Sequence, residues 1–215
     1  MPGAPEGEGP AGGSGDALAE FVTVMRRLRA ECPWKQEQTH RSLQRYLVEE
    51  TYETLEAIDV GAASGEWRHL REELGDLLLQ VVFHAVIAEE GGEFDLEQVA
   101  RGITAKMIRR NPHVFGAGAR GETAGELDAD AVNDLWQEAK AAEKGATSPS
   151  PLPPGLPALL YADKTLDRWE RAGRPVEIDP ESPELGERLL ALAVEARAAG
   201  VDAEQALRDA VRRRG

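Results

Sequence analysis

The sequence predicts an all-α protein, and three observations support this. Apolar residues recur at intervals of three and four along most of the chain, as they do on one side of an α-helix. Strand signals are nearly absent, since aromatic residues make up only 5% of the chain and runs of β-branched residues are short. Stretches rich in glycine or proline separate the periodic segments. The expected architecture is a helical bundle.

The first ninety residues contain a tail and three predicted helices. Residues 1–15 are rich in Gly, Pro and Glu, and we expect a disordered tail. Asp16 is a suitable N-cap for a first helix, which carries Phe21, Val22 and Met25 at helical spacing and ends before Pro33. A second helix is predicted from about residue 42 to 60 and a third from about 66 to 90, joined by the turn "GAASGE".

The rest of the chain divides into a helical end of the same domain, a linker and a second helical part. Asp95 is a good N-cap for a fourth helix that stops before Pro112, residues 112–130 read as loop, and a fifth helix spans 131–144. We therefore expect one domain at 16–144, a Pro-rich linker at 145–157 and a helical part at 158–215. That last part repeats a piece of the first, because "ELGDLLLQVVFHAVIA" (73–88) is similar to "ELGERLLALAVEARAA" (184–199).

Composition excludes several classes of protein. Asp and Glu number 39 against 25 Lys and Arg, and a net charge of −14 argues against general nucleic-acid binding. A single cysteine, Cys32, cannot build a disulfide framework. No apolar run is long enough for a transmembrane helix, and the N-terminus lacks the pattern of a signal peptide. We expect a cytoplasmic protein with no membrane contact.

Two pairs of acidic residues stand among apolar positions of the second and third helices. Glu50 and Glu53 are three residues apart, and so are Glu73 and Asp76, so each pair shares one face of its helix. In an antiparallel hairpin about Ala63, Glu50 faces Asp76 and Glu53 faces Glu73. Carboxylates that close together repel one another and lose hydration, and a hard divalent cation relieves both costs. All-oxygen ligation favours Mg²⁺, with Mn²⁺ as the other possibility.

Two other interpretations compete with this metal site. Solvated acids on helix surfaces are common in so acidic a chain, although two mirrored pairs within apolar stripes favour the metal. A di-iron carboxylate bundle requires an inward Glu-x-x-His motif, which these acids lack.

The fourth helix ends in a basic cluster, "KMIRRNPHVF". Lys106, Arg109 and Arg110 lie within about one and a half turns. Such a cluster offsets the helix dipole in many proteins, but beside four carboxylates it also suits the phosphates of a metal-bound substrate. A tryptophan on a helix most often serves in packing, but Trp136 on the fifth helix is also a candidate to contact a nucleobase.

Four motifs together resemble the MazG family of nucleoside triphosphate pyrophosphohydrolases. They are "CPWKQEQTHRSL", "LVEETYETLEAI", "EELGDLLLQVVFHAVIAEEGGEFD" and "KMIRRNPHVFG", and the resemblance runs from about Phe21 to Lys144. It implies an all-α NTP pyrophosphatase fold completed by oligomerisation, as a homodimer or a higher homo-oligomer. It also implies Mg²⁺-dependent hydrolysis of a nucleoside triphosphate to the monophosphate and pyrophosphate, as in nucleotide-pool house-cleaning.

The resemblance also assigns roles to residues. It implies that Glu50, Glu53, Glu73 and Asp76 bind metal and that Lys106, Arg110 and Trp136 contact the nucleotide, while Arg109 helps to balance phosphate charge. Glu49 lies beside the metal ligands and is a candidate to orient water. Two positions depart from the family pattern, Asn111 in place of His and Lys35 in place of Asp. Neither position is a metal ligand.

The C-terminal part is expected to be a degenerate remnant of a second MazG domain. Glu184 and Glu187 stand where metal ligands would be, but no partner helix precedes them, so we expect catalysis in the first domain. A different class of function also fits: a catalytically weak helical oligomer that senses nucleotides or binds another protein. The four intact acids favour the enzyme.

Overall fold

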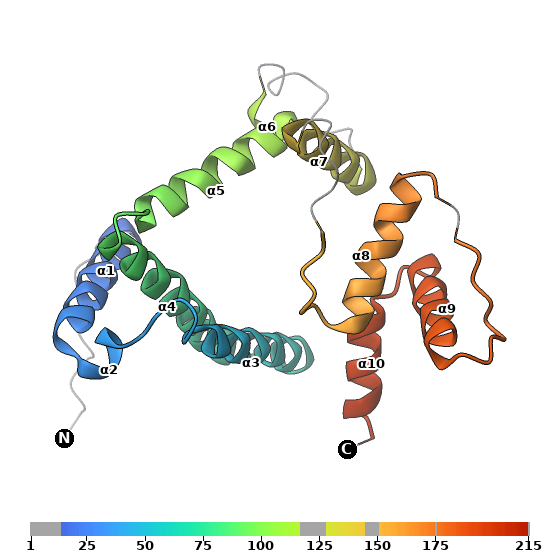
Figure 1. The fold of residues 1–215 in the computed structure, drawn as a ribbon, viewed down its shortest axis with the longest axis horizontal. Helices are drawn as coiled ribbons and strands as arrows, with labels where there is room; N and C mark the ends of the chain where they lie inside the picture. Colours follow the sequence, from blue (N-terminus) through green and yellow to red (C-terminus); the bar gives the residue numbers. More distant parts are fainter. Residues whose placement is uncertain (1–13, 117–127, 145–150, 175, 215) are drawn as a thin grey trace, which may run out of the picture. The chain divides into compact units, whose positions relative to one another are not determined.

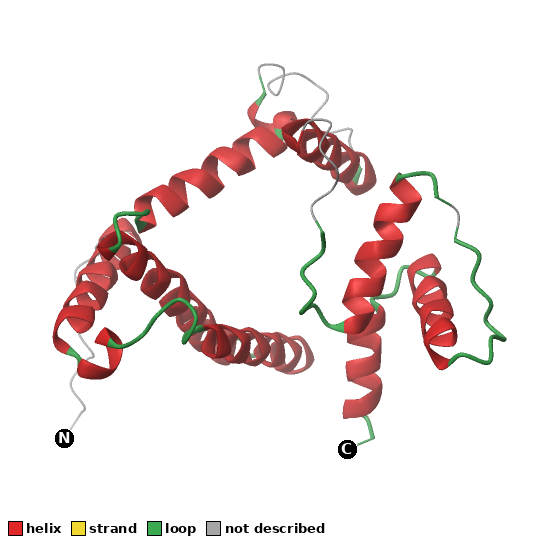
Figure 2. Ribbon diagram, in the orientation of Figure 1, coloured by secondary structure: helices red, strands yellow, loops and turns green. Residues whose placement is uncertain are grey.

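The computed structural model describes residues 14–116, 128–144, 151–174 and 176–214. Figures 1 and 2 show helices joined by loops in these ranges, which confirms the all-α fold class. The chain divides into two compact units, residues 1–143 and 144–215. The helices are α1 (Ser14–Glu31), α2 (Pro33–Gln36), α3 (Gln44–Ser64), α4 (Arg68–Glu90), α5 (Leu96–Arg110), α6 (Pro112–Phe115), α7 (Ala129–Lys144), α8 (Ala158–Arg171), α9 (Leu185–Ala198) and α10 (Ala203–Arg212).

The first unit is built around an antiparallel hairpin of α3 and α4, with α1 packed against α4. Its core is formed by apolar side chains of α1, α4 and the segment before α3, namely Val22, Met25, Leu43, Val82, Phe83 and Val86. Full burial of a side chain of this size contributes about 1.5–3 kcal/mol. The core therefore fixes the position of α4, on which two of the predicted metal ligands lie.

Several helix boundaries differ from the predicted ones. Asp16 is not an N-cap, because α1 begins at Ser14 and places Asp16 in its first turn. Residues 14–15 of the expected tail are thus helical, while 1–13 lie outside the described residues. The turn between α3 and α4 comes later than predicted, since helix α3 continues to Ser64 and is closed by Gly65 in a left-handed conformation (φ 79°). Alanine and serine favour or tolerate a helix, so "GAAS" extends α3.

The fourth predicted helix agrees with α5, whereas part of the loop predicted after it is helical. Asp95 caps α5 through a capping box with Gln98, and the helix ends two residues before Pro112. Residues 112–115, predicted as loop, form the short helix α6 with the proline in its first turn. The loop prediction for 117–127 lies outside the described residues, as does 145–150 of the predicted linker. None of the described helices combines the length and the low polarity needed to cross a membrane.

The second unit consists of α8, α9 and α10, each of which contacts the other two. Arg197 of α9 ties the unit together through ion pairs with three acids of α8, at 3.1 Å to Asp163 and Asp167 and 2.7 Å to Glu170. Leu166 and Ala193 are its buried apolar residues.

Two histidines connect the segment before α3 to α4. The Nδ1 atoms of His40 and His84 lie 2.8 Å apart, with ring planes at 2° and centroids 5.1 Å apart. This distance fits a hydrogen bond in which one ring nitrogen donates and the other accepts. Burial lowers the pKa of His84 below its usual 6.5, and the charge of His40 lowers it further.

We expect this pair to make stability depend on pH. The unfolded chain binds a proton at His84 more readily than the folded chain, so the contribution to stability is present above about pH 6.5 and is lost as the pH falls. Urea unfolding of wild type and His84→Asn at pH 8 and pH 5 measures this, and the wild type should lose more stability between the two. Equal losses of stability in the two proteins would show that protonation of this pair is not coupled to folding.

Candidate functional site

Three of the predicted metal ligands converge in the α3–α4 hairpin. Glu50 of α3 and Glu73 and Asp76 of α4 each offer a carboxylate oxygen, and these oxygens all lie within 4.8 Å of one another. Asp76 is exposed and Glu50 is partly buried, while the Glu73 side chain is only 12% exposed. The hairpin thus brings acids from two helices to one place, as the mirrored spacing predicted.

Glu53 lies beside this group rather than within it. It is exposed, and it is not among the three acids whose oxygens lie within 4.8 Å of one another. Burial raises the pKa of Glu50, and the charges of Asp76, Glu53 and Glu73 raise it further. Glu49 is exposed on α3, and no described contact joins it to the acids. We call Glu50, Glu53, Glu73 and Asp76 the carboxylate cluster.

The carboxylate cluster fits a hard divalent cation. With Mg–O distances of about 2.1 Å, octahedral ligand oxygens lie about 3.0 Å apart when adjacent and about 4.2 Å apart when opposite. Oxygens within 4.8 Å of one another need only a small closure to reach these values. One histidine also touches the cluster: His69 Nδ1 lies 3.3 Å from Glu73 Oε1, so His69 restrains the Glu73 carboxylate.

A second group of predicted residues meets where α5 ends and α7 packs on it. Trp136 of α7 lies under the Arg110 guanidinium, with the ring centroid 4.9 Å from Cζ. Glu143 lies on the same face of α7 as Trp136, about two turns further along the helix. Its carboxylate accepts hydrogen bonds from both arginines, at 2.7 Å from Arg109 Nε and 2.6 Å from Arg110 Nη2. Arg110 is buried and Arg109 exposed. Lys106 is partly buried one turn earlier on α5. We call Lys106, Arg109, Arg110 and Trp136 the basic group.

The two arginines lower the pKa of the Glu143 carboxyl to about 2, Arg110 most strongly through its hydrogen bonds. Because the folded pKa lies below the ordinary 4.5, Glu143 stabilises the contact of α7 with α5 above about pH 4.5, and this contribution is lost as the pH falls toward 2.

We therefore expect Glu143→Gln to weaken the docking of α7. Hydrogen exchange of α7 amides at pH 7 should become faster in the variant than in wild type. Glu138→Gln, an exposed acid on the same helix, serves as control and should change nothing. Unchanged α7 exchange in Glu143→Gln would show that the ion pairs do not hold this helix.

The carboxylate cluster and the basic group are separate within one chain. The acids of α4 lie near the start of that helix, whereas α5 follows from its end and leads away, so that Arg110 lies at the far end of α5 (Figure 1). From Asp76 to the end of α4 is about 21 Å at 1.5 Å per residue. No contact among the described residues joins the two groups.

Sequence reasoning missed Glu143 and His69. Both carried a usable signal. Glu143 follows Trp136 by seven residues and so shares its helix face, and His69 precedes Glu73 by four. A Glu-x-x-His motif places the histidine three residues after the acid, so His69, four residues before Glu73, does not match that motif.

Comparison with known proteins identifies the family. The model of the MazG nucleotide pyrophosphohydrolase domain matches residues 38–115. The chain is 36% identical to the nucleoside triphosphate pyrophosphohydrolase/pyrophosphatase MazG of Thermotoga maritima, over 93% of this chain and 83% of that protein. The chain belongs to the MazG family. Its MazG match contains the whole carboxylate cluster and Lys106, Arg109 and Arg110, while Trp136 and Glu143 follow it.

Two other MazG relatives show the extent of the likeness. An uncharacterized 26.1 kDa protein of Streptomyces cacaoi is 43% identical over 91% of this chain and 78% of its own length. The nucleoside triphosphate pyrophosphohydrolase of Mycolicibacterium smegmatis is 42% identical over 92% of this chain, which spans 56% of that relative.

Proposed function

We propose that this protein hydrolyses nucleoside triphosphates to nucleoside monophosphate and pyrophosphate. One observation carries the proposal: the convergence of Glu50, Glu73 and Asp76, with Glu53 beside them, in a chain of the MazG family. Three relatives that cover most of this chain are named for this activity. The same reaction would serve to clear unwanted nucleotides from the cytoplasmic pool.

The carboxylate cluster would hold Mg²⁺, or Mn²⁺ in its place. A divalent cation there supplies charge neutralisation for the substrate phosphates and lowers the pKa of water. The chain's own residues do the rest: the four carboxylates fix the ligand geometry, and His69 holds Glu73 in place. Glu49, exposed beside the cluster, is the candidate to orient the attacking water toward the α-phosphorus.

The basic group would bind the rest of the substrate. Lys106, Arg109 and Arg110 would balance phosphate charge, and Arg110 presents its guanidinium already oriented by Trp136 and Glu143. Trp136 would contact the nucleobase.

A site that uses both groups requires a second copy of the chain, so we propose a homodimer or a higher homo-oligomer. The separation of the carboxylate cluster from the basic group within one chain supports this. The α3–α4 hairpin also exposes an apolar surface of the kind that a partner covers. Its members lie at helical spacing on the two helices: Val48 (55% exposed), Tyr52 (42%), Leu55 (38%), Leu74 (51%), Leu78 (41%) and Val81 (44%).

Incubating the purified chain with Mg²⁺ and a panel of NTPs and dNTPs tests the proposal. We expect NMP and pyrophosphate in equal amounts, resolved by ion-exchange chromatography, and no product after chelation with EDTA. Absence of NMP from the whole panel would favour the alternative of a nucleotide sensor or protein-binding oligomer.

Deletion of residues 150–215 should leave turnover measurable. All residues of the carboxylate cluster and of the basic group belong to the first unit, residues 1–143. We expect kcat/KM within about ten-fold of the full chain, since a ten-fold change corresponds to only 1.4 kcal/mol. A truncated protein that is folded by circular dichroism but inactive would show that the second unit completes the site.

A further inference from the structure

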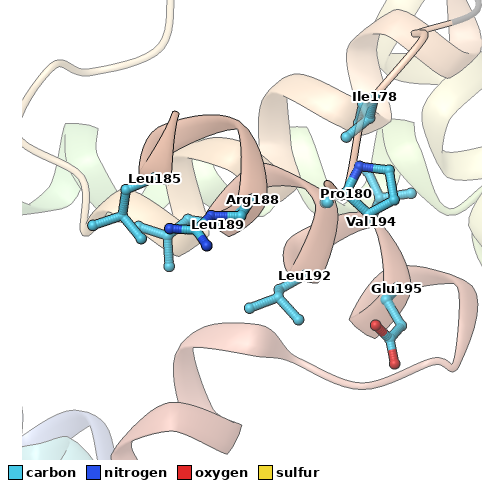
Figure 3. Close-up of a pocket in the computed structure, with 9 residues that line it drawn as sticks. Ile178, Pro180, Leu185, Arg188, Leu189, Leu192, Val194 and Glu195 are labelled. Atoms are coloured by element: carbon cyan, nitrogen blue, oxygen red, sulfur yellow. The ribbon is translucent and has the colours of Figure 1, made fainter. Parts of the chain in front are cut away.

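We propose that α9 of the second unit binds α9 of a second copy of this chain in antiparallel orientation. The side of α9 that carries Leu185, Leu189 and Leu192 is left uncovered, with these leucines 63%, 47% and 59% exposed. They line a groove of about 620 Å³ whose other wall includes Ile178 and Pro180 (Figure 3). Large apolar side chains grouped on one helix face mark an interaction surface.

Two charged residues of the groove identify the occupant. Arg188 and Glu195 lie along one edge of the leucine stripe, seven residues apart (Figure 3). Neither forms an ion pair with any residue that the structure describes, although Arg197 on the same helix forms three. One cation and one anion thus lie beside the leucine stripe.

Antiparallel self-association pairs these charges. Arg188 and Glu195 are equidistant from the point between Ala191 and Leu192. A two-fold axis through that point places Arg188 of each copy beside Glu195 of the partner subunit, twice in the dimer. Leu192 lies next to the axis, and Leu185 and Leu189 of each copy lie over the C-terminal half of α9 of the partner subunit. Parallel packing would instead place like charges together.

The internal repeat shows why α9, and not α4, is the partner. Leu185, Leu189 and Leu192 correspond to Leu74, Leu78 and Val81 of α4, which are also exposed. The positions of Arg188 and Glu195, however, correspond to Leu77 and His84. If α9 packed on α4, neither Arg188 nor Glu195 would face a residue of opposite charge, and the contact would be less specific.

The charge of the second unit permits self-association. Residues 151–215 contain 12 acidic and 10 basic residues, whereas the whole chain has a net charge of −14. The repulsion that opposes contact between two copies therefore arises chiefly from the first unit.

Cross-linking of the full chain tests the proposal. In a Cys32→Ser background, Leu192→Cys places a thiol next to the two-fold axis, and a short bis-maleimide should give a covalent dimer on a denaturing gel. Glu187→Cys is the matched control, because Glu187 is exposed on a different side of α9 and should give little dimer. Equal yields from the two variants would overturn the proposal.

Charge reversal separates this contact from dimerisation through the first unit. Added to Leu192→Cys, Arg188→Glu should lower the cross-linking rate about ten-fold, as should Glu195→Arg, since each introduces two like-charge contacts. The double variant Arg188→Glu/Glu195→Arg should restore the rate. If the cross-linking rate were the same in all these variants, other contacts would be what brings the two copies of α9 together, and the proposal would be wrong.

Discussion

Asp76→Asn should reduce NMP release by about 10²-fold or more while the protein remains folded. The substitution removes a negative ligand from the carboxylate cluster, and cation catalysis of this kind contributes several kcal/mol to transition-state stabilisation. Because Asp76 is exposed and its charge raises the pKa of Glu50, removing it should not destabilise the metal-free protein. Glu53→Gln should act in the same direction. Product release is measured at saturating NTP and Mg²⁺, and folding by thermal unfolding.

The matched control is Glu72→Gln. Glu72 is an exposed acid on the same helix, one residue before Glu73, and it lies outside the cluster. Its variant should keep wild-type turnover. Normal activity in Asp76→Asn would remove the basis for assigning a metal to these acids.

Arg110→Gln should reduce kcat/KM by about 10²-fold, because it removes a charge-assisted contact to the substrate phosphates. The substitution leaves Glu143 with Arg109 as its partner, so the protein should remain folded. Arg101→Gln is the control: Arg101 is exposed on the same helix and forms an ion pair with Glu97 of that helix. Unchanged kcat/KM in Arg110→Gln would exclude this residue from the site.

Mixing the two inactive variants shows whether the site spans two copies. If each site takes its carboxylates from one copy and its basic group from another, a dimer of Asp76→Asn with Arg110→Gln contains one intact site. After mixing and exchange of subunits, activity should return to about a quarter of wild type, since half the dimers are mixed and each has one working site. No recovery in a mixture shown to exchange subunits would place both groups of one site in the same chain.

The sequence alone predicted the fold class and the convergence of Glu50 with Glu73 and Asp76, for a physical reason. Spacing on a helix is periodic, so Glu50 and Glu53 must share a face, as must Glu73 and Asp76. A hairpin then limits which residues of the two helices meet. The prediction placed the turn at Ala63, whereas helix α3 continues to Ser64, yet Glu50 still meets Glu73 and Asp76. Side-chain packing between the helices, rather than the turn, sets that register.

Contacts between distant segments required the tertiary structure. The pairing of Arg109 and Arg110 with Glu143 joins residues more than thirty positions apart in the sequence, and no local pattern specifies such a contact. The contact of His40 with His84 is of the same kind. The exposure of Leu185, Leu189 and Leu192 is also a tertiary property, because it depends on which side of α9 the helices α8 and α10 cover.

The sequence by itself thus determined that the protein is helical, that four acids lie on two facing helix stripes, and that a basic cluster ends the fourth predicted helix. These features follow from periodicity within single helices, which is a local property. Only the tertiary structure decided that Glu53 stands beside the other three acids, that Glu143 holds the arginines, and that one chain keeps acids and arginines apart. These features depend on how the helices pack against one another and on the direction of each helix, and both are set by the whole domain.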